Sequence, residues 1–217
     1  MANIAVVKET LATNTRGPAP RPESDRAART RARLQAVALD LFVRQGFEET
    51  TVEQIAAAAG VSHMTFFRYF PTKESVAVED PYDPLLAEAV AAQPATLSAF
   101  ERVRRGTRDA MAAAPPSVDL ESAARIGLMS LTPALRARAW ENTNETQRVI
   151  IEALVATGSP RADAVVATGA CIGAVMTALL DWGAQADPRP SLGECVIDAL
   201  DRLDPRRLLA APEEETS

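Results

Sequence analysis

Helix-start signals recur at short intervals along this chain, and they constrain its fold more than any other feature. One kind is the capping box, in which a Ser or Thr side chain and a Glu or Gln three residues later each bond the other's backbone amide. Another is a capping residue followed directly by proline, because the first position of a helix needs no N–H. The capping boxes begin at Thr51, Ser98 and Ser191, and the proline signals are Asp83-Pro84, Thr132-Pro133 and Ser159-Pro160.

The composition agrees with a helical chain. Aromatic residues make up only 5% of the sequence, and Ala-rich stretches outnumber the Val, Ile and Tyr runs that favour strands. Hydrophobic residues make up 47%, which is enough to form a core. We therefore predict an all-α protein of about nine helices, four short ones up to about residue 80 and five in a larger body.

Several classes of protein are disfavoured. Two cysteines, Cys171 and Cys195, cannot form a framework of several disulfides or a CxxC zinc site, so we expect a cytoplasmic location and no metal. The first ten residues lack the charged segment and apolar core of a signal peptide. The 17 uncharged residues between Asp163 and Asp181 are at the lower limit of a membrane span. Glycines and threonines interrupt them, so we expect a buried helix and no membrane contact.

Charge is distributed unevenly along the chain, whose net charge is −6. The first 33 residues carry seven basic groups and three acids, whereas the remaining residues carry 16 basic groups and 26 acids. A basic arm on an acidic body can hold a polyanion at one end. The alternative is a solvated tail, which charge alone favours.

These patterns divide the chain into four segments. Residues 1–24 contain three prolines and no hydrophobic period, which predicts a disordered basic arm. The short helices fall within residues 25–80. The larger body covers residues 81–204, and residues 205–217 form a flexible acidic tail.

The segment 51–70, TVEQIAAAAGVSHMTFFRYF, has the pattern of two short helices joined by a tight turn. Gly60 suits a turn with a positive φ, and Ala56 is small enough to let two helices cross closely. Apolar residues such as Phe66 fix the angle between the helices. Any two capped amphipathic helices could share part of this pattern, but the combination favours a helix-turn-helix. Its second helix, from Ser62 to about Phe70, would enter the major groove of DNA.

A wider stretch, residues 29–75, resembles the TetR family of bacterial transcriptional regulators. The matching residues are Ala38, Phe42, Gly46-Phe47, Thr51-Val52, Ile55-Ala56, Gly60-Val61-Ser62, Thr65, Phe67-Arg68-Tyr69-Phe70 and Lys73-Glu74. The run FFRYFPTKE and the following YDPLLAEAV also look like a TetR subgroup with acyl-CoA-like ligands. The resemblance implies a ligand-responsive homodimer that binds a palindromic operator on double-stranded DNA, with residues 81–204 as the ligand-binding and dimerisation domain.

The resemblance also assigns DNA contacts to the helix-turn-helix and its flanks. The predicted DNA-binding residues are Arg31, Arg33, Thr51, Ser62, His63, Met64, Thr65, Phe67, Arg68, Tyr69 and Lys73. Phe67 stands where the family usually has Tyr, so Arg68 or Tyr69 would supply the missing phosphate contact. Met64 is larger than the usual residue and suits a thymine methyl group. Lys73 would hold the DNA backbone.

The body supplies signals for an effector site. Methionine adapts to irregular shapes, which favours an apolar effector. Asn144 and Arg148 lie one and two turns beyond Trp140, where they could meet a carboxylate or phosphate at its polar end. The same residues could be plain core. The predicted effector-binding residues are Leu85, Met111, Ile126, Met129, Trp140, Asn144 and Arg148.

The last two helices are the predicted dimer interface. The resemblance implies that they pack against the same pair in a second copy, and the run between Asp163 and Asp181 is apolar nearly all round. The alternative is that these helices belong to the core of one chain. The predicted interface residues are Gly169, Gly173, Val196, Leu200 and Leu203.

Two other functions stay open as alternatives. An enzyme acting on an acyl ester or thioester finds little support, because the single histidine, His63, lies on the DNA-reading helix and cannot serve a buried triad. No glycine-rich loop for a phosphate-bearing cofactor is present. An architectural DNA binder would lack an effector response. We favour a repressor that is not an enzyme and requires no cofactor.

Overall fold

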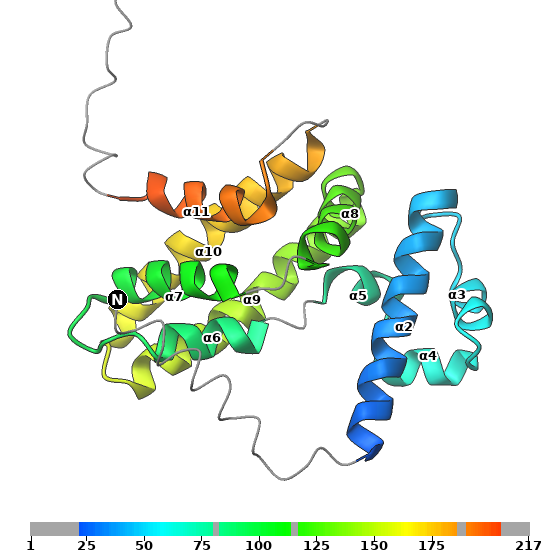
Figure 1. The fold of residues 1–217 in the computed structure, drawn as a ribbon, viewed down its shortest axis with the longest axis horizontal. Helices are drawn as coiled ribbons and strands as arrows, with labels where there is room; N and C mark the ends of the chain where they lie inside the picture. Colours follow the sequence, from blue (N-terminus) through cyan, green and yellow to red (C-terminus); the bar gives the residue numbers. More distant parts are fainter. Residues whose placement is uncertain (1–21, 80–82, 114–116, 186–189, 205–217) are drawn as a thin grey trace, which may run out of the picture.

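The computed structural model describes residues 22–79, 83–113, 117–185 and 190–204. These ranges contain ten helices and no strand, so the predicted all-α class is confirmed. The first four of these helices form the N-terminal part and the last six form the body (Figure 1). The N-terminal helices are α2 (Pro22–Gln45), α3 (Val52–Ala58), α4 (His63–Tyr69) and α5 (Lys73–Val78). The body consists of α6 (Asp83–Ala91), α7 (Ala99–Ala113), α8 (Ser117–Leu131), α9 (Pro133–Ala156), α10 (Arg161–Ala184) and α11 (Leu192–Arg202).

Three features of the helices differ from the sequence prediction. The described residues form ten helices rather than nine, because neither a capping box nor a capping residue followed by proline marks the start of α8 at Ser117 and this helix was not predicted. The first helix is 24 residues long rather than short. It begins at Pro22, so residues 22–24, assigned to the disordered arm, are helical. The remainder of the arm and the acidic tail lie outside the described residues.

Local chemistry explains the short helices. The Thr51 hydroxyl accepts a hydrogen bond from the Gln54 amide, and the Gln54 side chain accepts one from the Thr51 amide, so the predicted capping box is present. A second box at Ser191 opens α11. Gly60 has a φ of 63°, a left-handed conformation that suits glycine and produces the tight turn between α3 and α4.

One apolar core runs from the N-terminal helices into the body. Phe42, Ile55 and Phe66 are almost fully buried and hold α2, α3 and α4 together. The same cluster continues to Ile126 on α8 and Trp182 on α10. Because the core is continuous, the position of the helix-turn-helix depends on the packing of the body.

Helix α10 is the centre of the body and packs against α7, α8, α9 and α11. By length and composition alone it could cross a membrane, but Ala167, Cys171 and Trp182 are buried by the surrounding helices. The predicted buried helix is therefore confirmed on one side only, since Val165 and Val166 are exposed. The approach to α8 is close: a Cβ added at Gly183 would lie 2.4 Å from the Ser130 Oγ.

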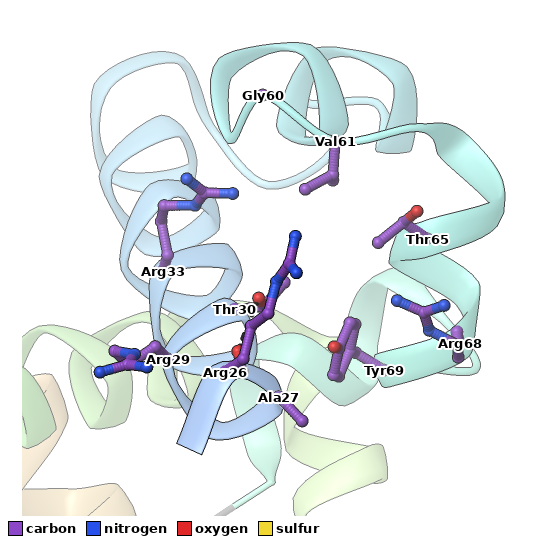
Figure 2. A pocket seen from close by; sticks show the side chains of 10 residues that line it. All are labelled: Arg26, Ala27, Arg29, Thr30, Arg33, Gly60, Val61, Thr65, Arg68 and Tyr69. Carbon is purple, nitrogen blue, oxygen red and sulfur yellow. Dashed lines mark hydrogen bonds between the residues drawn. The ribbon is translucent and has the colours of Figure 1, made fainter. Parts of the chain in front are cut away.

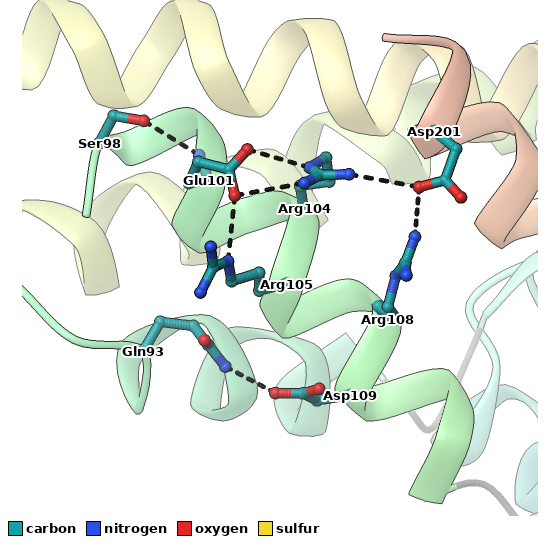
Figure 3. A network of polar contacts seen from close by, with 8 residues as sticks. All are labelled: Gln93, Ser98, Glu101, Arg104, Arg105, Arg108, Asp109 and Asp201. Atoms are coloured by element: carbon teal, nitrogen blue, oxygen red, sulfur yellow. Dashed lines mark hydrogen bonds and ion pairs between the residues drawn. The ribbon is translucent and has the colours of Figure 1, made fainter. Parts of the chain in front are cut away.

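Charged side chains tie α7 to α11 (Figure 3). The Arg104 guanidinium donates from Nε to Glu101, 3.1 Å away, and from Nη1 to Asp201, 3.2 Å away. Arg105 donates to Glu101, and Arg108 pairs with Asp201. These charged groups together fix the last helix to the body.

Candidate nucleic-acid interface

Helix α4 presents one buried face and one exposed face. The Ser62 hydroxyl caps it by accepting from the Thr65 amide at 3.1 Å, and Phe66 is fully buried against α2 and α3. His63, Met64, Phe67 and Arg68 fall at i, i+1, i+4 and i+5, so they share the opposite side. Met64 is 76% exposed and Phe67 40% exposed, which is unusual for apolar residues on a helix with a well-packed inner face.

The start of α4 is held by α3. His63 Nε2 lies 3.3 Å from a Glu53 carboxylate oxygen, and its ring meets the Phe67 ring edge-on with centroids 4.7 Å apart. The pKa of Glu53 is lowered, first by its own backbone amide, then by the Thr51 hydroxyl and to a smaller extent by His63. His63 is therefore oriented by two neighbours while half of its side chain stays exposed.

A cleft of about 950 Å³ lies beside α4 (Figure 2). Arg26, Arg29 and Arg33 line it from α2, at i, i+3 and i+7, and Arg68 and Tyr69 line it from α4. The full lining is Arg26, Ala27, Arg29, Thr30, Arg33, Gly60, Val61, Thr65, Arg68 and Tyr69. Four guanidinium groups and no carboxylate among these ten residues make the cleft an attractive site for phosphates.

Two of the predicted DNA-binding residues also bind acceptors within the domain. Lys73 Nζ donates to the carbonyl oxygens of Phe47 at 2.8 Å and Thr50 at 3.1 Å. Arg31 pairs with Glu79 and donates to the Tyr69 carbonyl oxygen at 2.8 Å. Both cations bind internal acceptors and so help to hold the domain together; their contact with the DNA backbone stays a prediction.

Thr51 and Ser62 have a structural task as caps of α3 and α4. Both residues are nevertheless exposed, and each hydroxyl can still donate its proton to a phosphate oxygen while its oxygen accepts from the helix. Thr65 is half-buried, and its hydroxyl lies 2.9 Å from that of Ser62. The geometry is compatible with the predicted contacts of all three residues.

Comparison with known families identifies this arrangement. Residues 34–79 match the model of bacterial regulatory proteins, tetR family, and residues 97–207 match the model of the MftR C-terminal domain. The second match covers half of the chain. The chain belongs to the TetR family of transcriptional regulators. Regulators of this family are ligand-responsive DNA-binding repressors that act as dimers, which agrees with the resemblance found in the sequence.

Curated relatives of this TetR-family protein are similar over only part of its length. The HTH-type transcriptional regulator TcmR of Streptomyces glaucescens is 58% identical over 50 residues, which are 23% of this chain and 22% of that protein. The HTH-type transcriptional regulator EthR of Mycolicibacterium smegmatis is 37% identical over 81 residues, 37% of each chain. The alignments thus span between 22% and 37% of these relatives.

A solved structure extends the likeness to the body. The fatty acid degradation regulator FadR from Bacillus halodurans superposes with a TM-score of 0.50 at 17% identity, over 80% of this chain and 93% of that chain. At this identity the likeness concerns the fold alone.

The predicted effector residues have different surroundings in the body of this TetR-family protein. Ile126 and Met129 are buried in the core, whereas Leu85, Trp140 and Arg148 are exposed. Asn144 is also exposed, and Met111 is half-buried. The Arg148 guanidinium is held by the neighbouring Glu145 at 2.9 Å. The i, i+4 row that joins Trp140 to Arg148 is an exposed row of α9, whereas Ile126 and Met129 are buried. A shared effector site stays a prediction.

The predicted dimer residues divide into two groups. Val196 and Leu200 are buried within the chain, so for them the alternative of intrachain core is correct. Leu203 is half-buried and packs against the same cluster. Gly169 and Gly173 have open space beside them on α10, since a Cβ added at either would meet no neighbouring atom within 4 Å.

Two relevant residues were missed in the sequence, Arg26 and Glu79. Arg26 shares the i, i+3, i+7 row of Arg29 and Arg33, a basic stripe that helical periodicity could have revealed. Glu79 accepts from Arg31 of α2, and its carbonyl oxygen accepts from Arg125 of α8. No local pattern points to Glu79, because both partners lie more than 40 residues away.

Proposed function

We propose that this protein represses transcription by binding a palindromic operator as a homodimer, and that a small, largely apolar effector releases it. The observation that carries the proposal is the exposed face of α4 beside the arginine-lined cleft. Met64 and His63 present groups that suit base edges, and the cleft presents four cations to the adjacent backbone. The acidic body would be repelled by DNA, which orients the N-terminal domain toward it.

The dimensions of α4 support reading of the major groove. Seven residues at about 1.5 Å per residue give a helix of roughly 10 Å, which fits a groove about 12 Å wide. Met64 is 76% exposed and offers an apolar contact for a thymine methyl group. Arg68 lies at the cleft side of the same face, where a phosphate contact is favoured.

A second copy would cover the exposed side of α10. Val165 and Val166 are exposed apolar residues, and Gly169 and Gly173 leave room for a helix to approach closely. A symmetric pair would place two recognition helices against two half-sites about one DNA turn, roughly 34 Å, apart. This symmetry is the reason to expect a palindrome.

The effector site is best sought where the two apolar clusters of the body meet. Met111 and Leu179 contact both clusters, so a ligand that separates α7 from α10 would enter there. Methionine accommodates varied apolar shapes. To release DNA, the ligand must favour a dimer geometry in which the recognition helices no longer fit successive grooves.

Enzymatic chemistry has weaker support from the side chains. Burial raises the pKa of the Cys171 thiol to about 12, so this cysteine is not a thiolate nucleophile near neutral pH. His63 lies on an exposed helix with Glu53 as its acidic neighbour. The relatives are named as transcriptional regulators.

The test is to sequence the fragments of the source genome that the purified protein retains. We expect a shared palindromic motif, and competition by that motif but not by its scrambled sequence. Equal retention of scrambled DNA would contradict a sequence-specific regulator.

A further inference from the structure

Glu79 joins the helix-turn-helix to the body. It caps the C-terminal end of α5. Its carbonyl oxygen accepts from Gln35 Nε2 of α2 at 3.0 Å and from Arg125 Nη1 of α8 at 3.2 Å. Its carboxylate pairs with Arg31 of α2. One residue therefore contacts both the DNA-binding domain and the body.

Arg31 extends this chain of contacts to the recognition helix. Its Nη1 donates to the carbonyl oxygen of Tyr69, the last residue of α4, at 2.8 Å. Its guanidinium lies 4.4 Å from the centre of the Phe70 ring. A cation is favoured at this position because the last carbonyls of a helix carry partial negative charge. The end of α4 is thus connected through Arg31 and Glu79 to Arg125.

The surroundings make this connection stiff. The Arg31 side chain is 38% exposed and that of Glu79 is 28% exposed, so solvent screens the pair less than a pair on the open surface. Ser75, Val76, Ala77 and Val78, the four residues before Glu79, are buried where α5 packs against α8 and α9. The contacts of Glu79 with Gln35 and Arg125 use its backbone carbonyl, whereas its contact with Arg31 uses its carboxylate. A change of the side chain can therefore remove the Arg31 contact and keep the other two.

We infer that Glu79 is a positioning residue that sets the angle of α4 relative to the body through its carboxylate contact with Arg31. The inference rests on the proposed function, since in a dimer this angle fixes the separation of the two recognition helices. Loss of the carboxylate charge would leave α4 folded on Phe66 and able to read a half-site. The dimer would lose its preference for one distance between half-sites.

The experiment compares operators that differ only in half-site spacing. The palindrome retained by the wild-type protein is used as it stands, with one base pair inserted and with one removed; each change moves a half-site by roughly 3.4 Å and about 35° around the helix. We expect E79Q to reduce the ratio of affinities between native and altered spacing roughly tenfold. Arg125→Met should also reduce this ratio, because it removes the hydrogen bond from α8 of the body to the Glu79 carbonyl oxygen.

The controls separate positioning from stability and from the function itself. E145Q, which removes the charge of an exposed ion pair on α9, should keep the wild-type spacing ratio. Equal weakening by E79Q at every spacing, or an unchanged ratio in both E79Q and Arg125→Met, would overturn the positioning role. Failure of the wild-type protein to prefer a palindrome would instead contradict the proposed function.

Discussion

The ammonium of Lys73 lies 4.1 Å from the centre of the Phe47 ring while donating to the carbonyl oxygen of the same residue at 2.8 Å. Phe47 follows α2 and packs at 5.0 Å between centroids on Phe42, and Lys73 is the first residue of α5. The two contacts of this ammonium, with the ring face and with the carbonyl oxygen, hold the loop between α2 and α3 against the start of α5.

Lys73→Met should therefore destabilise the protein rather than weaken DNA binding directly. The change keeps the apolar stem and removes hydrogen bonds from a charged donor to two carbonyl oxygens, worth about 1.5–3 kcal/mol. Thermal unfolding measures the effect, with the exposed Arg33→Met as a control that should change stability little. A Lys73→Met protein of wild-type stability that binds every DNA sequence more weakly would restore the backbone-contact hypothesis.

Met64→Ala should change sequence preference without changing stability. The side chain is 76% exposed, so its removal should alter the free energy of unfolding by less than about 0.5 kcal/mol. Without an apolar group against a thymine methyl, the preference for one A·T pair should relax by about 1–3 kcal/mol. Competition with operators substituted at single positions measures this preference. Leu131 on α8 is an apolar residue of similar exposure, and Leu131→Ala should leave the base preference at every operator position unchanged.

Removing the cleft arginines should reduce the salt dependence of DNA binding. Each phosphate that a cation neutralises releases counterions, and it contributes about 0.9 to the slope of log affinity against log salt. Changing Arg26, Arg29 and Arg33 together to Gln should lower the slope by up to roughly 2–3. Fluorescence titrations between low and physiological salt give the slope. Glutamine at Arg136, Arg138 and Arg148 of α9, which also removes three charges, is the matched control. An unchanged slope in the cleft variant would exclude DNA from the cleft.

Sequence patterns predicted what is local in this fold and failed where partners are distant. A capping box is made by residues three positions apart, so the start of α3 at Thr51 was visible in the sequence. The inward turn of Arg31 depends on Glu79, 48 positions away, and that of Lys73 on a carbonyl 26 positions away. An arginine on an exposed helical row has the same local pattern whether it meets DNA or an internal acceptor.

The body illustrates a second limit of prediction from sequence, which concerns the partner of an apolar helix face. Val196 and Leu200 form one apolar face of α11, and this face would look the same against a second copy or against the same chain. Only the packing of α10 and α7 shows that it is internal. For the same reason the row of Trp140 and Arg148 could not be distinguished from a pocket wall.

The pair formed by Glu101 with Arg104 predicts a pH-dependent contribution to stability (Figure 3). Burial raises the pKa of the Glu101 carboxyl, but hydrogen bonds from Arg104 and Arg105 outweigh this and the pKa is lowered below its ordinary value of 4.5. The folded state thus favours the carboxylate. Its contribution is present above the ordinary pKa and disappears as the pH falls through the lowered one.

E101Q should accordingly lower the melting temperature at pH 7 and have no such effect in acid. An ion pair of this kind contributes about 1 kcal/mol or less, which is about 2–4 °C for a chain of this size. Thermal unfolding of both proteins between pH 7 and pH 3 gives the difference as a function of pH. A difference that persists at the acid end would indicate a packing defect rather than a missing charge.

Val166→Asp should separate the proposed dimer while leaving the single chain folded. Val166 is 72% exposed on α10, so in one chain the aspartate stays hydrated and stability should change by less than about 0.5 kcal/mol. In a dimer built on this side of α10, the carboxylate would be buried without a partner, which costs several kcal/mol and weakens association at least 100-fold. Light scattering at micromolar concentration should give a dimer mass for the wild type and for Val43→Asp, an exposed apolar position on α2, but a monomer mass for Val166→Asp. Affinity for the palindrome should fall with the dimer, because each half-site would then be bound separately. A Val166→Asp protein that keeps the dimer mass would place the interface on another surface.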